Sequence, residues 1–394
     1  MNLNKLFLVI FFSLVFNGCA FIVSRVVPVN DIQPPSGEYE IGTQIFHWID
    51  NNREEWFSSK EEDKRELMVQ VWYPALEPDD SIDPYPWIDN ASLREEAIIE
   101  NFKVPKFVAK AVNRVDTETY LNSIPILSEK FPIVIFSHGF EGFRSQNTTQ
   151  IQELVSNGYI VFALDHTYDA TLTIMPDGRL IPNARKYCDG CEPEEFYEVF
   201  LPQINTRIND IKFILNQVEK INNGNIKTNF ANALDIENIG VFGHSFGGGT
   251  SLATSILDSR IKSCISLDGW YVPVHPDIYN QGLKIPFLHL GQVEWDTPIN
   301  YEILDKILDT KVTQAYKLSL DGASHMDFTD SPHISKLSSS FNLSSGLDSE
   351  EILRVTNTTV VGFFDEHLKS KNTNWLVELR KNINTKVEEF QGDK

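Results

Sequence analysis

Ser245 stands at the centre of the sequence GHSFG, which matches the pattern G-x-S-x-G. An apolar run over residues 239–242 predicts a buried strand before it, and the residues up to Leu257 predict a helix after it. A strand, a sharp turn and a helix lift a serine hydroxyl out of the sheet, where it can act as a nucleophile. Gly243 and Gly247 suit this turn, since a Cβ at either position would crowd the strand against the helix.

A nucleophilic serine needs a base that takes its proton and an acid that orients this base. In folds with this turn, the chain order is Ser, acid, His. His325 follows the strand predicted over residues 314–320, where the base belongs. Asp268 and Asp296 each follow a predicted strand, and the carboxyl ends of parallel strands share one sheet edge. The spacing therefore predicts His325 as the base and leaves both acids open.

Two backbone N–H groups must face the negative charge that develops during attack on a carbonyl carbon. Phe246 begins the helix after the nucleophile, so its N–H is one predicted donor. The second donor should come from the loop after an earlier strand, here the sequence SHGF that follows residues 131–136. Phe140 is predicted as this donor, with Gly139 allowing close backbone approach. His138 is interpreted as a brace for the loop.

The chemistry requires a scaffold of strands alternating with helices. Four apolar runs have the length of buried strands: residues 131–136, 159–164, 261–267 and 285–290. The amphipathic run Ile204–Ile221 predicts a helix just before the nucleophile segment. The pattern favours the α/β class, with a mainly parallel sheet flanked by helices. Thr171–Pro202 shows no clear period and is predicted as an insertion, a lid over the site.

The amino terminus has the layout of an export signal. Lys5 precedes the apolar run Leu6–Phe16, which is too short to span a bilayer, and small residues lead to Cys19. We expect a signal peptide at residues 1–18, a lipidated Cys19 and attachment to a bacterial membrane through this lipid. A cleaved signal without lipid and an uncleaved anchor are the alternatives, and all three export the protein. A linker over residues 19–36 would then precede a single domain over residues 37–394.

Composition limits the partners of the chain. The formal net charge of −21 over 394 residues argues against nucleic acid, which requires a basic face. Cys188 and Cys191 form one C-x-x-C pair without the further ligands that zinc needs, which favours a local disulfide in an exported protein. Cys264 lies in an apolar run and is expected in the core.

Six separated motifs carry a family resemblance: VQVWYPA, FSHGFEGFR, GYIVFALDH, GHSFGG, SLDGW and GASHMDFTD, together with the helix RINDIKFIL. In this order they resemble the plasma and intracellular type II platelet-activating-factor acetylhydrolases, the lipoprotein-associated phospholipase group, over roughly residues 37–330. The resemblance implies an α/β-hydrolase fold with no metal or cofactor. It implies a triad of Ser245, Asp268 and His325, with the amides of Phe140 and Phe246 as donors, and so favours Asp268 over Asp296.

The resemblance also implies a substrate: a phospholipid carrying a short or oxidised acyl group. A second hypothesis is a secreted carboxylesterase or a polyester hydrolase similar to cutinases, because the sequence DTP after Trp295 resembles the acid segment of those enzymes. A third is a surface lipoprotein with a hydrolase fold but without activity, which the complete set of triad candidates disfavours.

Overall fold

The computed structural model describes residues 27–60, 62–79, 81–188, 190–309, 313–382 and 384–391. The predicted signal peptide and Cys19 lie outside these residues. Among the helices within these ranges, none is both long enough and apolar enough to span a membrane.

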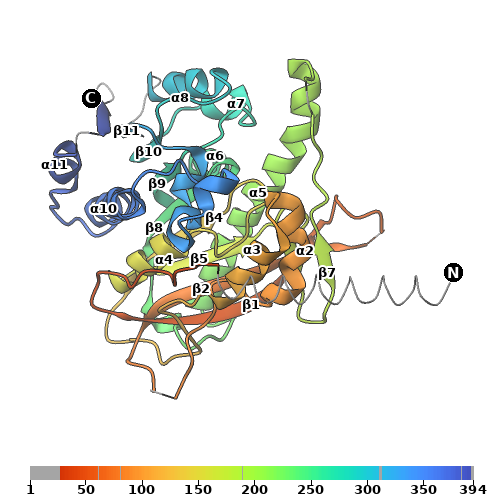
Figure 1. Cartoon of the computed structure of the whole chain (residues 1–394), viewed down its shortest axis with the longest axis vertical. Helices are drawn as coiled ribbons and strands as arrows, with labels where there is room; N and C mark the ends of the chain where they lie inside the picture. Colours follow the sequence, from red (N-terminus) through yellow and green to blue (C-terminus); the bar gives the residue numbers. More distant parts are fainter. Residues whose placement is uncertain are drawn as a thin grey trace.

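The chain alternates strands and helices for most of its length (Figure 1). The strands are β1 (Glu40–Glu54), β2 (Lys64–Ala75), β3 (Tyr120–Leu121), β4 (Phe131–Ser137), β5 (Ile160–Asp165), β6 (Leu172–Ile174), β7 (Leu180–Pro182), β8 (Leu234–His244), β9 (Ile261–Leu267), β10 (Phe287–Gln292), β11 (Gln314–Leu320) and β12 (Thr385–Gln391). The helices are α2 (Ala91–Phe102), α3 (Lys106–Ala111), α4 (Thr148–Ser156), α5 (Pro193–Asn222), α6 (Phe246–Leu257), α7 (Pro276–Tyr279), α8 (Ile299–Asp309), α9 (Ser331–Ile334), α10 (Ser349–Leu368) and α11 (Trp375–Arg380).

One ten-stranded sheet organises the domain, in the order β12-β11-β10-β9-β8-β4-β5-β2-β1-β3. The strands from β11 to β5 in this order pair in parallel, and β12 and β2 pair antiparallel at the two ends of that run. Because the carboxyl ends of parallel strands share one edge, the loops after β4, β8, β9, β10 and β11 gather there. The predicted α/β fold with a mainly parallel sheet is confirmed.

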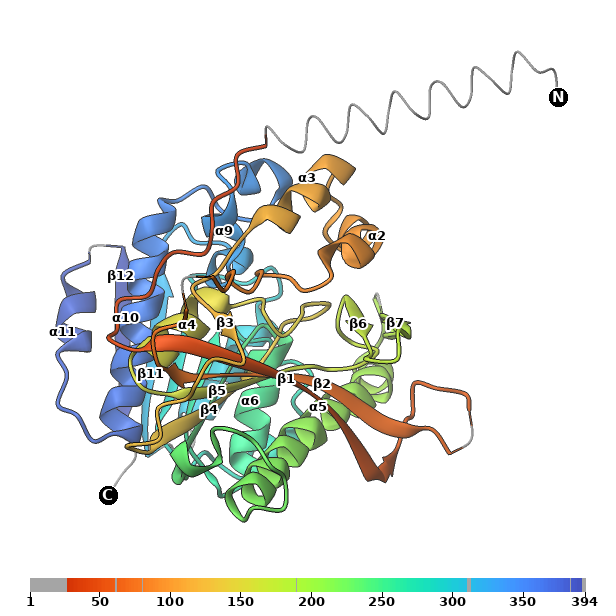
Figure 2. The ribbon, with the colours of Figure 1, turned by 90° about the horizontal axis from the view of Figure 1, so that it is seen from below.

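The central strands are apolar throughout because both faces of the sheet are covered (Figure 2). In β4, Ile133 and Ile135 pack in the cluster that includes side chains of α5, α6 and α8. Val134 and Phe136 pack on the opposite face, in the cluster that includes α4, α10 and α11. The alternation along one strand therefore fills two separate cores.

The predicted insertion is shorter than expected. Thr171–Pro202 contains the β6–β7 hairpin, but its last residues belong to α5, which begins at Pro193 rather than near Ile204. Proline suits the first turn of a helix, and the following Glu194 and Glu195 complement the helix dipole there. The prediction that Pro202 precedes the helix was wrong, because this proline lies inside it.

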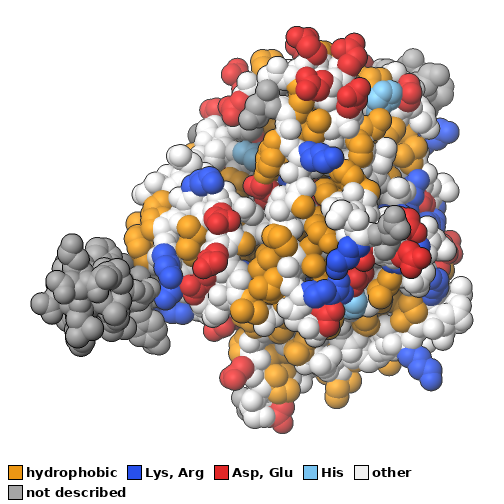
Figure 3. Space-filling model, turned by 90° about the vertical axis from the view of Figure 1, so that its right-hand side faces the viewer, with side chains coloured by type: hydrophobic (Ala, Val, Ile, Leu, Met, Phe, Trp, Pro, Cys, Tyr) orange, Lys and Arg blue, Asp and Glu red, His pale blue; other side chains and the backbone are white. Residues whose placement is uncertain are grey.

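Figure 3 shows a broad band of hydrophobic side chains on the face that carries α2 and β7.

Two further segments complete the domain. The strand predicted over residues 314–320 is β11, and β12 pairs antiparallel with it and closes that edge of the sheet. The described part of the predicted linker, residues 27–36, is held against the domain. Its Ile32 is buried and donates its N–H to the carbonyl of Asp116, and the N–H of Asn30 reaches the carbonyl of Ile334.

Candidate active site

Ser245 occupies the sharp turn between β8 and α6. Its φ of 55° and ψ of −120° place a non-glycine residue in strained backbone geometry. Hydrogen bonds to the neighbouring strand hold the turn: the N–H of Ser245 donates to the carbonyl of Leu267 at 3.0 Å, and its carbonyl accepts from the N–H of Trp270 at 2.8 Å. A Cβ on Gly247 would lie 1.9 Å from the carbonyl oxygen of Ser137, so only glycine permits this approach of helix to strand.

His325 begins a short helical turn in the loop after β11, where the sequence places the base. Its Nδ1 lies 2.6 Å from Oδ2 of Asp268, the residue directly after β9. The carboxylate can only accept, so Nδ1 carries the proton and Nε2 has a free lone pair. Asp296, the other candidate acid, is exposed on the wall of the same pocket. The structure therefore brings Asp268 to His325.

Asp268 is buried and held by donors from three segments. Its Oδ1 accepts from the N–H of Gln292, from Nε1 of Trp295 and from the hydroxyl of Tyr301, at 3.0–3.1 Å. Its Oδ2 accepts from Nε2 of Gln292 and from His325. Burial raises the pKa of this carboxyl, but the hydrogen bond and charge of His325, with its other donors, outweigh burial and hold the pKa below its usual range. Asp268 is therefore a fixed negative charge beside His325.

A series of side-chain contacts joins the loop after β4, the turn at Ser245 and the loop that carries His325. Oε1 of Gln146 accepts from the N–H of Gly139 at 2.8 Å, and Nε2 of Gln146 contacts Nδ1 of His244 at 3.0 Å. Nε2 of His244 lies 3.0 Å from the carbonyl oxygen of His325. If Gln146 donates to Nδ1 of His244, Nε2 of His244 carries the proton that reaches this carbonyl. The roles of Gln146 and His244 could not be predicted from the sequence, although His244 lies within GHSFGG and Gln146 stands two residues after FSHGFEGFR.

The loop after β4 turns directly above the nucleophile. A Cβ on Gly139 would lie 2.8 Å from Nδ1 of His244 and 3.4 Å from Cβ of Ser245, which explains the glycine. Phe140 follows in this loop, and Phe246 is the first residue of α6, whose N–H has no acceptor within the helix. Over the described ranges, neither of these two amides donates a hydrogen bond to the protein. Both are therefore free to bind an anionic oxygen.

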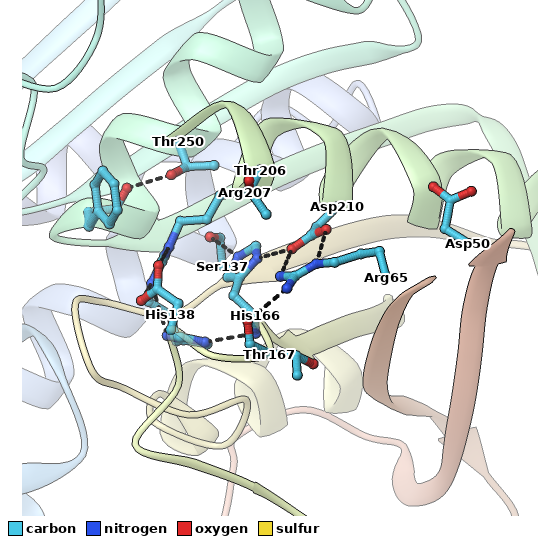
Figure 4. A network of polar contacts seen from close by, with 12 residues as sticks. Asp50, Arg65, Ser137, His138, His166, Thr167, Thr206, Arg207, Asp210 and Thr250 are labelled. Atoms are coloured by element: carbon cyan, nitrogen blue, oxygen red, sulfur yellow. Dashed lines mark hydrogen bonds and ion pairs between the residues drawn. The ribbon is translucent and has the colours of Figure 1, made fainter. Parts of the chain in front are cut away.

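A buried polar network fixes this loop from behind (Figure 4). Nη1 of Arg207, on α5, donates to the carbonyl of His138 at 2.6 Å, and its Nε and Nη2 each lie 2.6 Å from Asp169. Nε2 of His138 accepts from the N–H of His166 at 3.1 Å, which confirms the predicted bracing role of His138. The ring of His166 continues the network to Asp210 at 2.9 Å. The carbonyls of the loop point into this network.

Two histidines of the network are held neutral. Burial and the nearby charge of Arg207 lower the pKa of His166 to about 4 and place that of His138 well below its usual value. Because a ring with so low a pKa accepts a proton poorly, neither is a candidate for the catalytic base.

An open pocket of about 900 Å³, including its mouth, contains Ser245 and His325. Its remaining wall combines the aromatic side chains of Phe102, Phe140, Trp270 and Trp295 with polar ones that include Gln292 and Asp296. This pocket suits an ester with an apolar portion.

The predicted lid lies behind this wall rather than forming it. Phe200 of α5 packs edge-on against Trp270, with 5.1 Å between ring centres, and Tyr187 packs against Phe140 at 5.4 Å. Cys188 and Cys191 are joined by a disulfide directly after Tyr187. Glu195 lies close enough to share a metal with the two sulfurs, but disulfide sulfurs are not the thiolates that zinc prefers.

The solved structures include a close fold relative. The ferulic acid esterase of Streptomyces cinnamoneus superposes with a TM-score of 0.69 at 25% identity, covering 87% of this chain and 94% of that one. The match covers nearly the whole domain and supports ester hydrolysis as the activity.

Curated proteins give a second comparison. The platelet-activating factor acetylhydrolase of Gallus gallus is 26% identical over 269 residues, 62% of this chain, and the match spans 63% of the chicken protein, less than two thirds of its length. The probable 1-alkyl-2-acetylglycerophosphocholine esterase of Arthroderma benhamiae is 25% identical over 80% of this chain and 81% of its own length.

The sequence pattern of one family matches residues 28–387, which include every residue of the site described above. That family is platelet-activating factor acetylhydrolase, isoform II, as the motif resemblance implied. The chain therefore belongs to the isoform II family of platelet-activating factor acetylhydrolases.

Proposed function

We propose that this protein is a serine esterase that removes a short or oxidised acyl group from a glycerophospholipid through an acyl-enzyme. The observation that carries the proposal is the 2.6 Å contact between His325 and Asp268 in the pocket of Ser245. Family membership and the names of the relatives support the phospholipid substrate.

Each group has a role that its position supports. Asp268 accepts the Nδ1 proton of His325, so Nε2 is left to take the proton of Ser245 as its oxygen attacks the ester carbonyl. The same Nε2–H then protonates the departing alcohol, and a water molecule repeats the sequence on the acyl-enzyme. The amides of Phe140 and Phe246 are the proposed donors to the oxyanion.

The test compares wild type with Ser245→Ala on 1-alkyl-2-acetylglycerophosphocholine. We expect a loss on the order of 10⁴-fold or more, since a triad acts as a unit. An organophosphate should label Ser245, as read by mass spectrometry of the labelled peptide. Full activity of the alanine variant, or label on another serine, would exclude the assignment.

A second candidate function is a carboxylesterase acting on other esters. The match to a ferulic acid esterase and the open, aromatic pocket favour it. An activity panel separates the two: acetylglycerophosphocholine, long-chain phosphatidylcholine, a nitrophenyl ester and a soluble polyester fragment. Preference for the acetylated phospholipid supports the first candidate, and preference for the polyester or nitrophenyl ester supports the second.

We also propose export with a lipid on Cys19, from the sequence of the amino terminus. Cys19→Ser should release the protein from the membrane fraction or leave the precursor uncleaved. A variant that fractionates and migrates as the wild type does would favour an uncleaved anchor instead.

A further inference from the structure

A second cavity lies beside the catalytic pocket, between α2 and α3 on one side and the segment after His325 on the other. It is a partly open hollow of about 550 Å³, a volume that includes the open space at its mouth. Phe102, Gln146 and Met326 line both this cavity and the catalytic pocket, so the two spaces adjoin. Met326 directly follows the proposed base. Oε1 of Gln146 accepts a hydrogen bond from the N–H of Gly139, in the loop after β4 that carries Phe140. The opening therefore lies within reach of an ester bound at Ser245.

The wall of this cavity is almost entirely apolar. Its apolar members come from three parts of the chain: Trp87, Ile98, Val104, Val108, Phe143 and Leu343 are examples. The polar groups in the wall are mostly engaged already. Nε1 of Trp87 donates to the carbonyl of Ser145 at 2.9 Å and to Asp330 at 2.8 Å, and Gln146 is held as described. A charged or hydroxylated group would find few partners here, whereas an alkyl chain needs none.

A third cavity continues in the same direction. It shares Trp87, Val108 and Leu343 with the second cavity and reaches Val27 and Val29, the first described residues of the chain. Its wall is equally apolar, so a chain longer than the second cavity could extend along the same path. Figure 2 shows α2, α3 and α9 grouped on the side of the molecule where the described chain begins.

We propose that the second cavity is an alkyl-chain subsite, which holds an aliphatic chain of the ester attacked by Ser245. The inference rests on the proposed esterase function and adds a preference to it: esters with a medium-length aliphatic chain, not acetyl esters alone. The chain comes either from the acyl group or from the alcohol, and the chemistry of the wall is the same for both.

The test fills the cavity and measures chain-length preference in the full-length protein. Val108→Trp places a large ring in the wall from a half-buried position on α3. The matched control is Leu93→Trp on α2, whose side chain is 54% exposed and lines none of the three cavities. One arm uses p-nitrophenyl acetate, butyrate, hexanoate and octanoate. The other uses ethyl, butyl, hexyl and octyl acetate.

We expect Val108→Trp to lower the octanoate-to-acetate ratio of kcat/KM at least about tenfold if the chain is acyl. If the chain belongs to the alcohol, the ratio of octyl to ethyl acetate falls instead. Leu93→Trp should leave both ratios within about twofold. Unchanged ratios in Val108→Trp would overturn the subsite, even if a raised melting temperature shows that the ring fills the cavity. If the wild type hydrolyses no ester in either arm, the esterase function itself fails.

Discussion

Replacing Asp268 by asparagine tests the site most directly, because the structure predicts which way the new amide turns. The Oδ1 position faces three donors, from Gln292, Trp295 and Tyr301. An amide NH₂ placed there would oppose donors, including a backbone N–H that cannot reverse its role. The Oδ2 position faces the side-chain amide of Gln292, which can rotate, and the ring of His325, which can move its proton.

The NH₂ group of the asparagine is therefore expected at the Oδ2 position. His325 must then accept at Nδ1 and carry its proton on Nε2, which removes the lone pair that would take the proton of Ser245. We expect Asp268→Asn to lower kcat/KM for p-nitrophenyl acetate about 10⁴-fold, or about 5 kcal/mol of transition-state stabilisation.

Asp296→Asn is the control, because this residue is exposed and lines the same pocket. We expect it to stay within about threefold of the wild type. Circular dichroism and thermal melting establish that both variants are folded. If folded Asp268→Asn keeps more than a tenth of the activity, or if Asp296→Asn shows the large loss, the assignment of the acid is wrong.

Three further predictions concern the scaffold. Gly247→Ala should lower the free energy of unfolding by about 3 kcal/mol, measured in urea, because its Cβ would meet the carbonyl of Ser137. Burial lowers the pKa of His333 to about 4, so the unfolded chain binds a proton at this residue more readily than the folded one. The free energy of unfolding should therefore be unaffected by this residue above about pH 6.5 and fall by about 1.4 kcal/mol per pH unit from there toward pH 4. His333→Leu should remove that slope from urea titrations. Replacing Cys188 and Cys191 by serine should barely change the melting temperature, because the closed loop is short, but should raise KM for micellar phospholipid more than for p-nitrophenyl acetate. An equal rise in both would refute a role near the pocket wall.

Several strands of the sheet could be predicted because their sequences are compatible with few other secondary structures. The runs at β4, β5, β9 and β10 are too short and too uniformly apolar for surface helices, and each precedes polar or glycine residues. Parallel pairing then brings their carboxyl ends together. The expected position of Asp268 at that edge follows from these two facts. Ser245 and His325 were placed there by the G-x-S-x-G turn and by the chain order of the triad, without knowledge of any side-chain contact.

The contacts that orient the site could not be predicted in this way. The donors to Asp268 come from the end of β10, the loop after it and α8, and their meeting depends on how α8 packs. The first turns of α5 were also missed, because Pro202 was taken as a boundary. A proline inside a helix is costly, and this one is tolerated where Phe196 and Phe200 pack together and against Trp270.

A glycine in β10 distinguishes Asp268 from Asp296, although its meaning is clear only in the structure. Asp268 leaves β9 with a left-handed φ of 43°, which turns its carboxylate toward the neighbouring strand β10. That strand has a glycine at the facing position, and a Cβ on Gly291 would lie only 2.4 Å from Oδ1 of Asp268. The absence of a side chain at Gly291 thus leaves room for the buried carboxylate of Asp268. The exposed Asp296, which follows β10, does not depend on this room. Gly291→Ala should therefore displace Asp268 from His325 and lower kcat/KM for p-nitrophenyl acetate. The new Cβ would also lie 2.6 Å from Nε2 of the buried His289, so thermal melting must first establish that the variant is folded. An unchanged kcat/KM in the folded variant would contradict the role of Asp268.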